Sequence, residues 1–412
     1  MRRTDRPVLL AGLAVIAVTY GFGRYAYGLF VPRFAEALAL SSTALGVVGG
    51  LSHMGYGVGL VAAPRCVRRL GPRAVAAGAA AASAVGLAAV AGSVGAVTLG
   101  AAVAVAGLGS GLASPALAQV VTRRVAAARR SAAQTWVNSG TSLGLAVSAP
   151  AVLCGAAWRQ TWLVFAAVAA LVASATVRAL QDGVEPDDTE PDDAAPVPAR
   201  ADASTRRWSP SGAAVGLLVA SFVLGATSAP YWTFARQRVL EAGLAEAWSV
   251  GFWVLLGVSG LLGGSAGVTA RRRGLPAAIR WWSVPWLVAL TVLALPQVPV
   301  VAALVSAGAF GAAFMALTGL GILWAVATWP DATVGVRACF LALGAGQAVA
   351  TPLAGAVAGA VGLPAAFALA GGASLVLLVV AGRAPASSEV PTGHGEDPGS
   401  GAVRPGRNRA VR

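Results

Sequence analysis

Residues 182–204 read DGVEPDDTEPDDAAPVPARADAS, and this stretch separates two long apolar halves of the chain. It holds eight of the sixteen acidic residues and is rich in proline. Such a segment cannot bury a hydrophobic core, so we expect a disordered linker over residues 182–210. The Gly- and Pro-rich tail, residues 383–412, is expected to be disordered for the same reason.

Apolar runs of about 20 residues, each long enough to cross a bilayer, occur six times on either side of this linker. Hydrophobic residues make up 57% of the chain and charged residues 11%, with a mean hydropathy of +0.73. Soluble domains carry about 25% charged residues, so the composition predicts an integral membrane protein. The expected spans are 7–31, 43–63, 74–93, 95–121, 131–156, 160–181, 211–235, 247–270, 279–296, 298–328, 338–358 and 363–382.

Arginines gather in alternate connections between these spans. One set of connections contains the clusters Arg65–Arg73, Arg123–Arg130 and Arg271–Arg280, whereas the opposite set carries only Arg33, Arg159, Arg236 and Arg238. Basic residues favour the cytoplasmic side, which places both termini, the linker and the tail in the cytoplasm of a cell-membrane protein. An even number of spans satisfies this orientation.

Glycines recur at a nearly constant offset between the two halves. Gly71 and Gly274 are 203 residues apart, and Gly21 and Gly225 are 204 apart. The sequence therefore predicts an all-α membrane protein with twelve transmembrane helices in two pseudo-repeated six-helix bundles, residues 1–181 and 211–382. Internal repeats of this kind are typical of secondary transporters, whose solute site lies between the repeats.

Several functional classes are excluded by residue content. The chain has no lysine, so it cannot form a nucleotide-binding loop of the GxxxxGK[ST] type. Its three cysteines have no paired spacing, and we expect no disulfide, no metal site and no cofactor. The net charge of +14 is explained by the arginines flanking the membrane, so we expect a lipid bilayer and a small-molecule solute as partners, not nucleic acid. A monomer is expected.

Arg24 lies inside the first span, in the run TYGFGRYAYGLF at residues 19–30, and no expected span contains an acidic residue. Inserting an arginine at this depth costs ~2.5–3.5 kcal/mol, which makes it a candidate functional residue. Helical spacing places Tyr20, Arg24 and Tyr27 on one face, suited to a carboxylate or phosphate. The alternative is a structural arginine that binds carbonyls of a neighbouring helix or extends toward the interface.

Other polar residues in the spans are candidates for the same site. His53, with Tyr56 one turn away, is the main candidate for a proton relay, and its alternative is a neutral histidine bonded between helices. Amides in apolar helices either line a pocket or join helices. Tyr231 and Trp232, next to Ser228, could form the wall opposite Arg24, or belong to an interfacial aromatic belt. The remaining candidates are Gln134, Asn138 and Gln347.

Two stretches resemble a known family. GFGRYAYGLFVPRFAEALALS at residues 21–41, followed by GLSHMGYGVGL at residues 50–60, resembles the first helical hairpin of YbfB/YjiJ-type members of the major facilitator superfamily. WVNSGTSLGLAVSAP at residues 136–150 resembles their fifth helix. The resemblance to the superfamily as a whole covers essentially all twelve spans and implies a permease that works by alternating access.

The chain departs from that superfamily at two motifs. In the loop after the second helix, Pro64–Gly71, Arg68 stands where the family has an aspartate, and Arg271 stands there in the second copy, Gly267–Gly274. The resemblance makes these loops candidate gating elements, but the latch built on the aspartate is in doubt. Val103 stands where proton-coupled drug exporters carry an arginine. The candidate gating residues are Arg68, Arg69, Gly71, Arg271, Arg272 and Gly274.

The main hypothesis is therefore a secondary active or facilitative transporter of a small organic solute, with an anionic or strongly polar group held by Arg24. Protons are a candidate coupling ion through His53, and uniport or exchange is open. A membrane sensor or scaffold without transport is the second hypothesis. The third is an intramembrane hydrolase, because Ser142 and Ser265 lie in G-x-S-x-G matches, a pattern that chance also produces in a chain with 52 glycines.

Overall fold

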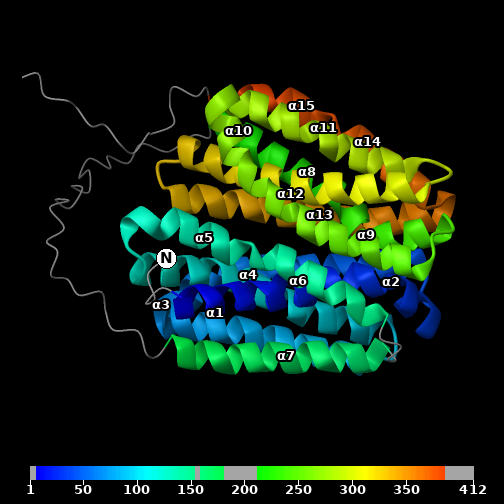
Figure 1. Ribbon diagram of the computed structural model, residues 1–412, viewed down its shortest axis with the longest axis horizontal. Helices are drawn as coiled ribbons and strands as arrows, with labels where there is room; N and C mark the ends of the chain where they lie inside the picture. The colour runs from blue at the N-terminus through cyan, green and yellow to red at the C-terminus, as the bar shows by residue number, and fades with distance from the viewer. Residues whose placement is uncertain (1–5, 154–157, 181–210, 386–412) are drawn as a thin grey trace, which may run out of the picture.

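The computed structural model describes residues 6–153, 158–180 and 211–385, and throughout these ranges the regular structure is helical. Ten of the helices are long and apolar enough to cross a membrane. Most of the expected linker and tail lies outside the described residues. The two halves form two sets of parallel helices that lie side by side (Figure 1).

The first half begins with one long helix, which is an α-helix at both ends and a π-helix in the middle. The half ends with α7. Its elements are α1 Arg6–Ile16, the π-helix η2 Ala17–Tyr25, α2 Ala26–Ala37, α3 Ser42–Ala91, α4 Ala96–Arg124, η3 Ala127–Arg129, α5 Arg130–Asn138, α6 Gly140–Ser148, η4 Ala149–Val152 and α7 Trp158–Ala179. The second half contains α8 Gly212–Glu241, α9 Glu246–Ser259, η5 Gly260–Ser265, α10 Ala266–Arg273, α11 Leu275–Ala294, α12 Val300–Thr328, α13 Ala332–Val361, α14 Leu363–Ser374, α15 Val376–Val380 and η6 Ala381–Arg383.

Ten long helices are found where the sequence predicts twelve spans, because one helix contains two of the spans and another span is divided into short helices. Gly71, at φ 79° and ψ 155°, breaks α3 into two segments, each long enough to cross a bilayer. The fifth expected span is itself interrupted, since α5, α6 and η4 follow one another over Arg130–Val152. Gly274 adopts nearly the same backbone angles as Gly71, φ 79° and ψ 157°, between α10 and α11. A positive φ is accessible mainly to glycine, so both halves require glycine at this turn.

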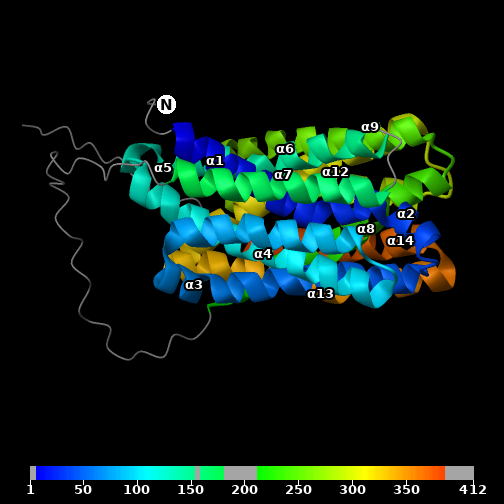
Figure 2. The ribbon, with the colours of Figure 1, turned by 90° about the horizontal axis from the view of Figure 1, so that it is seen from below.

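The halves meet through three pairs of helices. α3 packs along α13, α6 packs against α9, and α2 packs against α8; Figure 2 shows α13 running beside α3. Close approach depends on glycine: a Cβ on Gly46 would lie 2.8 Å from Gly355 Cα, and a Cβ on Gly50 would lie 2.9 Å from the Pro352 ring. Small residues at such positions allow backbones to pack closely within a bilayer.

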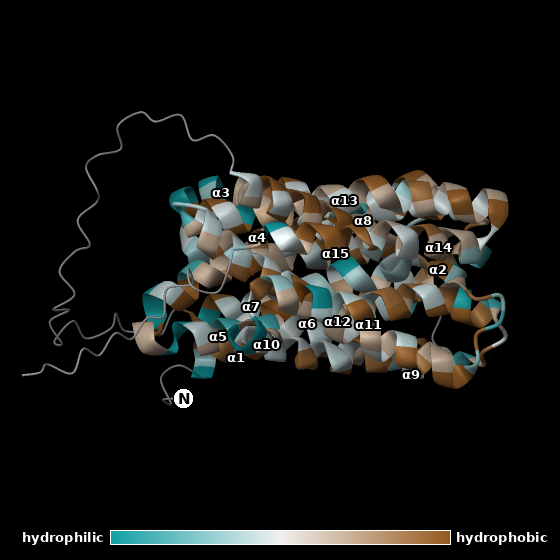
Figure 3. Ribbon diagram, turned by 90° about the horizontal axis from the view of Figure 1, so that it is seen from above, coloured by the Kyte–Doolittle hydropathy of each residue, from teal (hydrophilic) through white to brown (hydrophobic). Residues whose placement is uncertain are grey.

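Hydrophilic residues collect at one end of the molecule, near α5, α10 and the bend of α3 (Figure 3). Arg68, Arg69, Arg271 and Arg272 are all exposed and flank Gly71 or Gly274 there. We call this the arginine-rich end. The candidate gating residues therefore lie at the two matching turns, while their gating role stays a prediction.

The arginines at the opposite end, which we call the Arg33 end, are bonded within the fold. Arg159 donates to the carbonyls of Ala91 at 2.6 Å and Ser93 at 2.8 Å, where α3 ends. Arg238 donates to three carbonyls at and just after the end of α11, those of Leu293, Leu295 and Pro296. A cation at a helix C-terminus satisfies unpaired carbonyls and interacts favourably with the helix dipole. These residues are structural, which accounts for arginine on the sparsely charged side.

Candidate functional site

Arg24 lies near the middle of the first membrane helix, at the end of the π-helix η2, and its residue is 3% exposed. π-Helices are rare and frequently mark functional sites. Gly21, in the centre of η2, lies against Gly144 of α6, where a Cβ would approach the Gly144 backbone to 2.5 Å. The small residues let η2 pass close to α6. The wider turn of the π-helix also changes which side chains lie on the same side of the helix as Arg24.

Three tyrosine rings surround the Arg24 guanidinium. Its Cζ lies 3.7 Å from the ring centroid of Tyr56, 5.3 Å from that of Tyr25 and 5.7 Å from that of Tyr20. The hydroxyl of Tyr20 is paired with Ser114 Oγ at 2.8 Å. Cations are attracted to aromatic faces within about 6 Å, so the rings stabilise the charge of the buried guanidinium.

A chain of hydrogen bonds connects Arg24 to the other half of the molecule. Arg24 Nη2 donates to Gln347 Oε1 of α13 at 2.5 Å, and Gln347 Nε2 donates to Ser228 Oγ of α8 at 3.1 Å. Ser228 Oγ in turn donates to the Gly225 carbonyl at 2.7 Å. Arg24, Gln347 and Ser228 each lie near the middle of their membrane helix. The cluster therefore bridges the two halves at mid-depth.

Several buried polar atoms of the residues in and around this cluster have no hydrogen-bond partner. Among the described residues, no carboxylate lies within salt-bridge distance of Arg24. Arg24 Nε and Trp232 Nε1, which can only donate, are buried without a hydrogen-bond partner. His53 Nδ1 and Ser52 Oγ are also buried and unpaired. Buried polar groups are nearly always paired in proteins, so the unpaired Nε of Arg24 makes this cluster a candidate site for an acceptor group.

Trp232 and Tyr231, which the sequence treats as a pair, have different surroundings. The Trp232 ring stacks on Tyr25 across the interface, with centroids 4.0 Å apart. Tyr231 instead stacks on Phe310 at 3.7 Å, and its hydroxyl is paired with Ser306 Oγ at 2.8 Å. Successive residues of an α-helix point in different directions, so only Trp232 faces the Arg24 cluster.

Tyr27 is the main geometric difference from the sequence-based prediction. Its hydroxyl donates to the Leu45 carbonyl at 2.8 Å, and its ring packs on Phe34 with centroids 5.7 Å apart. The expected pairing of Tyr20 with Tyr27 about Arg24 assumes regular α-helical spacing. Within the π-helix the residue five positions on shares a side, and Tyr25 lies 6.3 Å from Tyr20. Tyr25 is therefore a site residue that sequence reasoning missed.

The polar candidates on the fifth span lie apart from the cluster. Gln134 Nε2 donates to Asn138 Oδ1 at 3.1 Å, one turn along α5, and Asn138 is exposed. His53, Tyr56 and Gln347, by contrast, are all buried at or beside Arg24. The structure thus brings together the predicted residues Arg24, Tyr20, His53, Tyr56, Trp232 and Gln347.

Comparisons with known proteins agree with this architecture. The family model of the Major Facilitator Superfamily matches residues 13–336. A search of curated proteins finds no match to the chain. The solved structures that match include transporters at 12–17% identity, a level that establishes the fold alone.

Three of these solved structures illustrate the similarity. A bacterial homolog of the human lysosomal transporter Spinster, inward-facing and unoccupied, has a TM-score of 0.72 and 12% identity, covering 93% of this chain and 96% of that one. A D-xylose–proton symporter has a TM-score of 0.69 and 17% identity, with coverages of 92% and 97%. The nucleoside transporter NupG has a TM-score of 0.68 and 13% identity, with coverages of 91% and 98%.

Proposed function

Because the chain belongs to the Major Facilitator Superfamily, we propose that it carries a small organic anion across a membrane by alternating access around Arg24. The family is one of transporters, so the hydrolase interpretation of Ser142 and Ser265 is not retained. The closer similarity of residues 21–41 and 50–60 to YbfB/YjiJ-type members is part of this proposal.

The observation that carries the proposal is the buried, uncompensated charge of Arg24. A guanidinium is costly at this depth, and a purely structural arginine would be expected to have its donors occupied. Here Nη2 bonds to a neutral amide, Nε is unpaired, and the surrounding groups are aromatic rings. A carboxylate or phosphate would supply both the negative charge and the paired acceptor oxygens that a guanidinium binds best.

The position of the cluster supports a transport role for this anion site. Arg24 and the tyrosines belong to the first half, whereas Gln347, Ser228 and Trp232 belong to the second. A solute bound between them would contact both halves and could be exposed to either side as they rock, as in other repeat-based transporters. The close glycine contacts between α3 and α13 lie toward the Arg33 end, so we infer that the solute path is closed there.

The arginine-rich end is proposed to face the cytoplasm, following the distribution of basic residues. In this orientation the closed Arg33 end faces outward, and the solute site would exchange with the cytoplasm. The linker between the halves would then be cytoplasmic, and its deletion over residues 184–207 should leave transport intact if it is only a tether.

The chemical class of the solute can be tested directly. Purified protein should gain thermal stability with organic carboxylates or phosphates and not with organic cations or neutral sugars at the same concentration. Ligand at 100 times its Kd stabilises a protein by about 2.7 kcal/mol, which is measurable as a shift in melting temperature. Proteoliposomes should then accumulate the stabilising anion. Stabilisation by sugars or cations alone would contradict the proposal.

His53 is the proposed relay if protons drive the transport. Its residue is 4% exposed, it lies one turn from Tyr56, and Nδ1 has no partner. Histidine is the side chain best suited to exchange a proton near neutral pH. Uptake driven by a pH gradient should therefore be lost in His53→Gln while exchange of internal for external solute persists. Equal gradient-driven uptake in the variant would remove His53 from the mechanism.

A further inference from the structure

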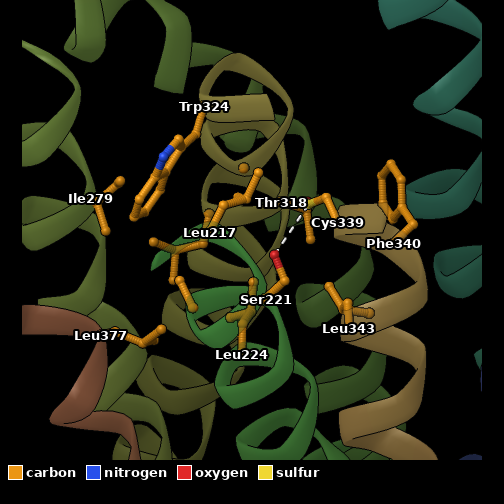
Figure 4. Close-up of a pocket in the computed structure, with 13 residues that line it drawn as sticks. Leu217, Ser221, Leu224, Ile279, Thr318, Trp324, Cys339, Phe340, Leu343 and Leu377 are labelled. Atoms are coloured by element: carbon orange, nitrogen blue, oxygen red, sulfur yellow. Dashed lines mark hydrogen bonds between the residues drawn. The ribbon is translucent and has the colours of Figure 1, made fainter. Parts of the chain in front are cut away.

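A cavity of about 30 Å³ lies inside the second half, away from Arg24 (Figure 4). Its walls come from α8, α11, α12, α13 and α15. Figure 4 shows Trp324 and Ile279 on one side of the cavity and Phe340 and Leu343 on the other. The residues that line it include Ser221, Leu224, Thr318, Cys339 and Leu343.

The polar atoms in these walls are already paired. Ser221 Oγ and Cys339 Sγ are 3.2 Å apart and hydrogen-bonded to each other. The hydroxyl of Thr318 donates to the carbonyls of Phe314 at 2.9 Å and Met315 at 3.0 Å. The cavity therefore presents hydrocarbon to its contents, and apolar cavities of this kind take up apolar groups more readily than water.

The cavity continues the helix faces that carry the Arg24 partners. On α8, Leu224 lies one turn from Ser228 and Ser221 lies two turns from it, at a spacing that keeps all three on one face. On α13, Leu343 lies one turn from Gln347 on the same face. Two helical turns correspond to about 10 Å along the axis. The apolar cavity thus begins within the length of a small molecule from the polar cluster.

Leu343 and Gly344 mark the connection between the two regions. Leu343 lines the cavity, and a Cβ on the adjacent Gly344 would lie 3.1 Å from the Tyr56 ring, which covers Arg24. A ligand held at Arg24 and Gln347 would therefore have an apolar wall on its arginine-rich side.

We propose that this cavity receives the apolar part of the solute whose anionic group binds Arg24. The transported class is then an alkyl or small aryl carboxylate, with the carboxylate at Arg24 and the hydrocarbon between α8 and α13. This inference rests on the proposed function, since it takes Arg24 as the anchor. In the state seen, the cavity has room for about two water-sized groups, which corresponds to the end of a short chain.

A chain-length series tests the proposal on the full-length protein. Acetate, butyrate, hexanoate and octanoate are titrated against wild type, and each methylene that reaches the cavity should tighten binding by about fourfold. Cys339→Leu and Ala220→Leu fill the cavity from two different helices. Both variants should bind acetate with the affinity of wild type, but their affinity should no longer increase with chain length. Val349→Leu on the exposed side of α13 should keep that increase.

Cys339 offers a second measurement at the cavity itself. With Cys66→Ser and Cys154→Ser, Cys339 is the remaining thiol, and its alkylation by N-ethylmaleimide is followed by mass spectrometry. Hexanoate at saturation should slow the alkylation at least fivefold, whereas saturating acetate should leave it unchanged. Equal protection by both would show that binding acts on Cys339 only indirectly, which contradicts the proposal.

The outcomes separate this inference from the function on which it rests. If the carboxylates bind with equal affinity whatever their length, and Arg24→Gln removes binding, the anion site stands and the cavity proposal fails. If neither a carboxylate nor an organic phosphate binds, the proposed function fails as well. If Cys339 is protected in lipid nanodiscs but not in detergent, with no effect of hexanoate, a lipid chain occupies the cavity and the proposal is overturned.

Discussion

Arg24→Gln is expected to abolish transport while the protein remains folded. The variant removes the charge that the solute requires, although glutamine can still hydrogen-bond to Gln347. Removing one partner of a buried, hydrogen-bonded charge pair costs at least ~2 kcal/mol of binding, so flux below saturation should fall at least ~30-fold. The measurement is initial uptake into proteoliposomes containing equal amounts of inserted protein.

Stability distinguishes this functional role from a structural one. The guanidinium costs ~2.5–3.5 kcal/mol at mid-membrane, so its replacement by a neutral side chain should leave the melting temperature unchanged or raise it. Arg24→Lys keeps the charge but loses the paired donors, and should retain partial transport. Arg178→Gln, which changes an exposed arginine on α7, is the matched control and should transport normally. A large loss of stability in Arg24→Gln would instead identify Arg24 as structural.

Glu246→Gln is expected to open the contact between the halves at the Arg33 end. Glu246, at the start of α9, bonds to the buried Arg236 and lies 3.7 Å from Arg33 Nη2 of α2. Arg236 also donates to the Leu29 carbonyl of α2 at 2.8 Å, so the carboxylate holds a charge that fastens α8 to α2. The side chain of Glu246 is 38% exposed. Glu246→Gln should therefore weaken the contact between the halves by a free energy between the ~1 kcal/mol of an exposed ion pair and the ~3 kcal/mol of a buried one.

A disulfide between the halves can measure this opening. A Cβ on Gly359 of α13 would lie 3.1 Å from Thr43 Oγ1 of α3, so Thr43→Cys and Gly359→Cys should cross-link when the end is closed. With the native cysteines replaced by serine, Glu246→Gln should lower the yield of cross-linked protein, because a loss of 1 kcal/mol shifts the closed–open equilibrium about fivefold toward the open form. Glu36→Gln, the other carboxylate near Arg33, serves as the control. An unchanged yield in Glu246→Gln would contradict the closing role.

The sequence predicts the overall fold well because a bilayer imposes simple rules. The lengths of the apolar runs predict the spans, and the offset between Gly71 and Gly274 predicts the repeat. The two glycines have nearly the same backbone angles, which agrees with that repeat. Breaks within a span are harder to predict. The interruptions between Arg130 and Val152 depend on packing, so the fifth expected span is not among the ten long helices of the described residues.

The structure brings together part of the predicted site, and the differences from the prediction have a physical origin. Arg24 stands out because a charge is rare in an apolar helix, and His53, Tyr56 and Gln347 stand out as polar groups in spans. The π-helix cannot be derived from α-helical spacing, and it exchanges Tyr27 for Tyr25 beside Arg24. The bond from Arg24 to Gln347 joins residues 323 positions apart, and no local pattern contains that information.

The departure of the arginine loops from the superfamily pattern has a counterpart at the opposite end. Arg68 and Arg271 replace the aspartate on which the usual latch depends, and both are exposed at the arginine-rich end. The carboxylate that connects the two halves in the described residues is Glu246, at the Arg33 end. An acid–arginine latch is therefore proposed at the side opposite to the one that the family motif suggests.

The most direct test of the account is equilibrium binding of an organic anion to purified wild type and Arg24→Gln. Wild type should show saturable stabilisation by the best carboxylate or phosphate of the screen, and Arg24→Gln should show none at the same concentration, with an unligated melting temperature no lower than that of wild type. Equal stabilisation of both proteins by the same anion would show that the charge in the centre of the first helix does not hold the solute.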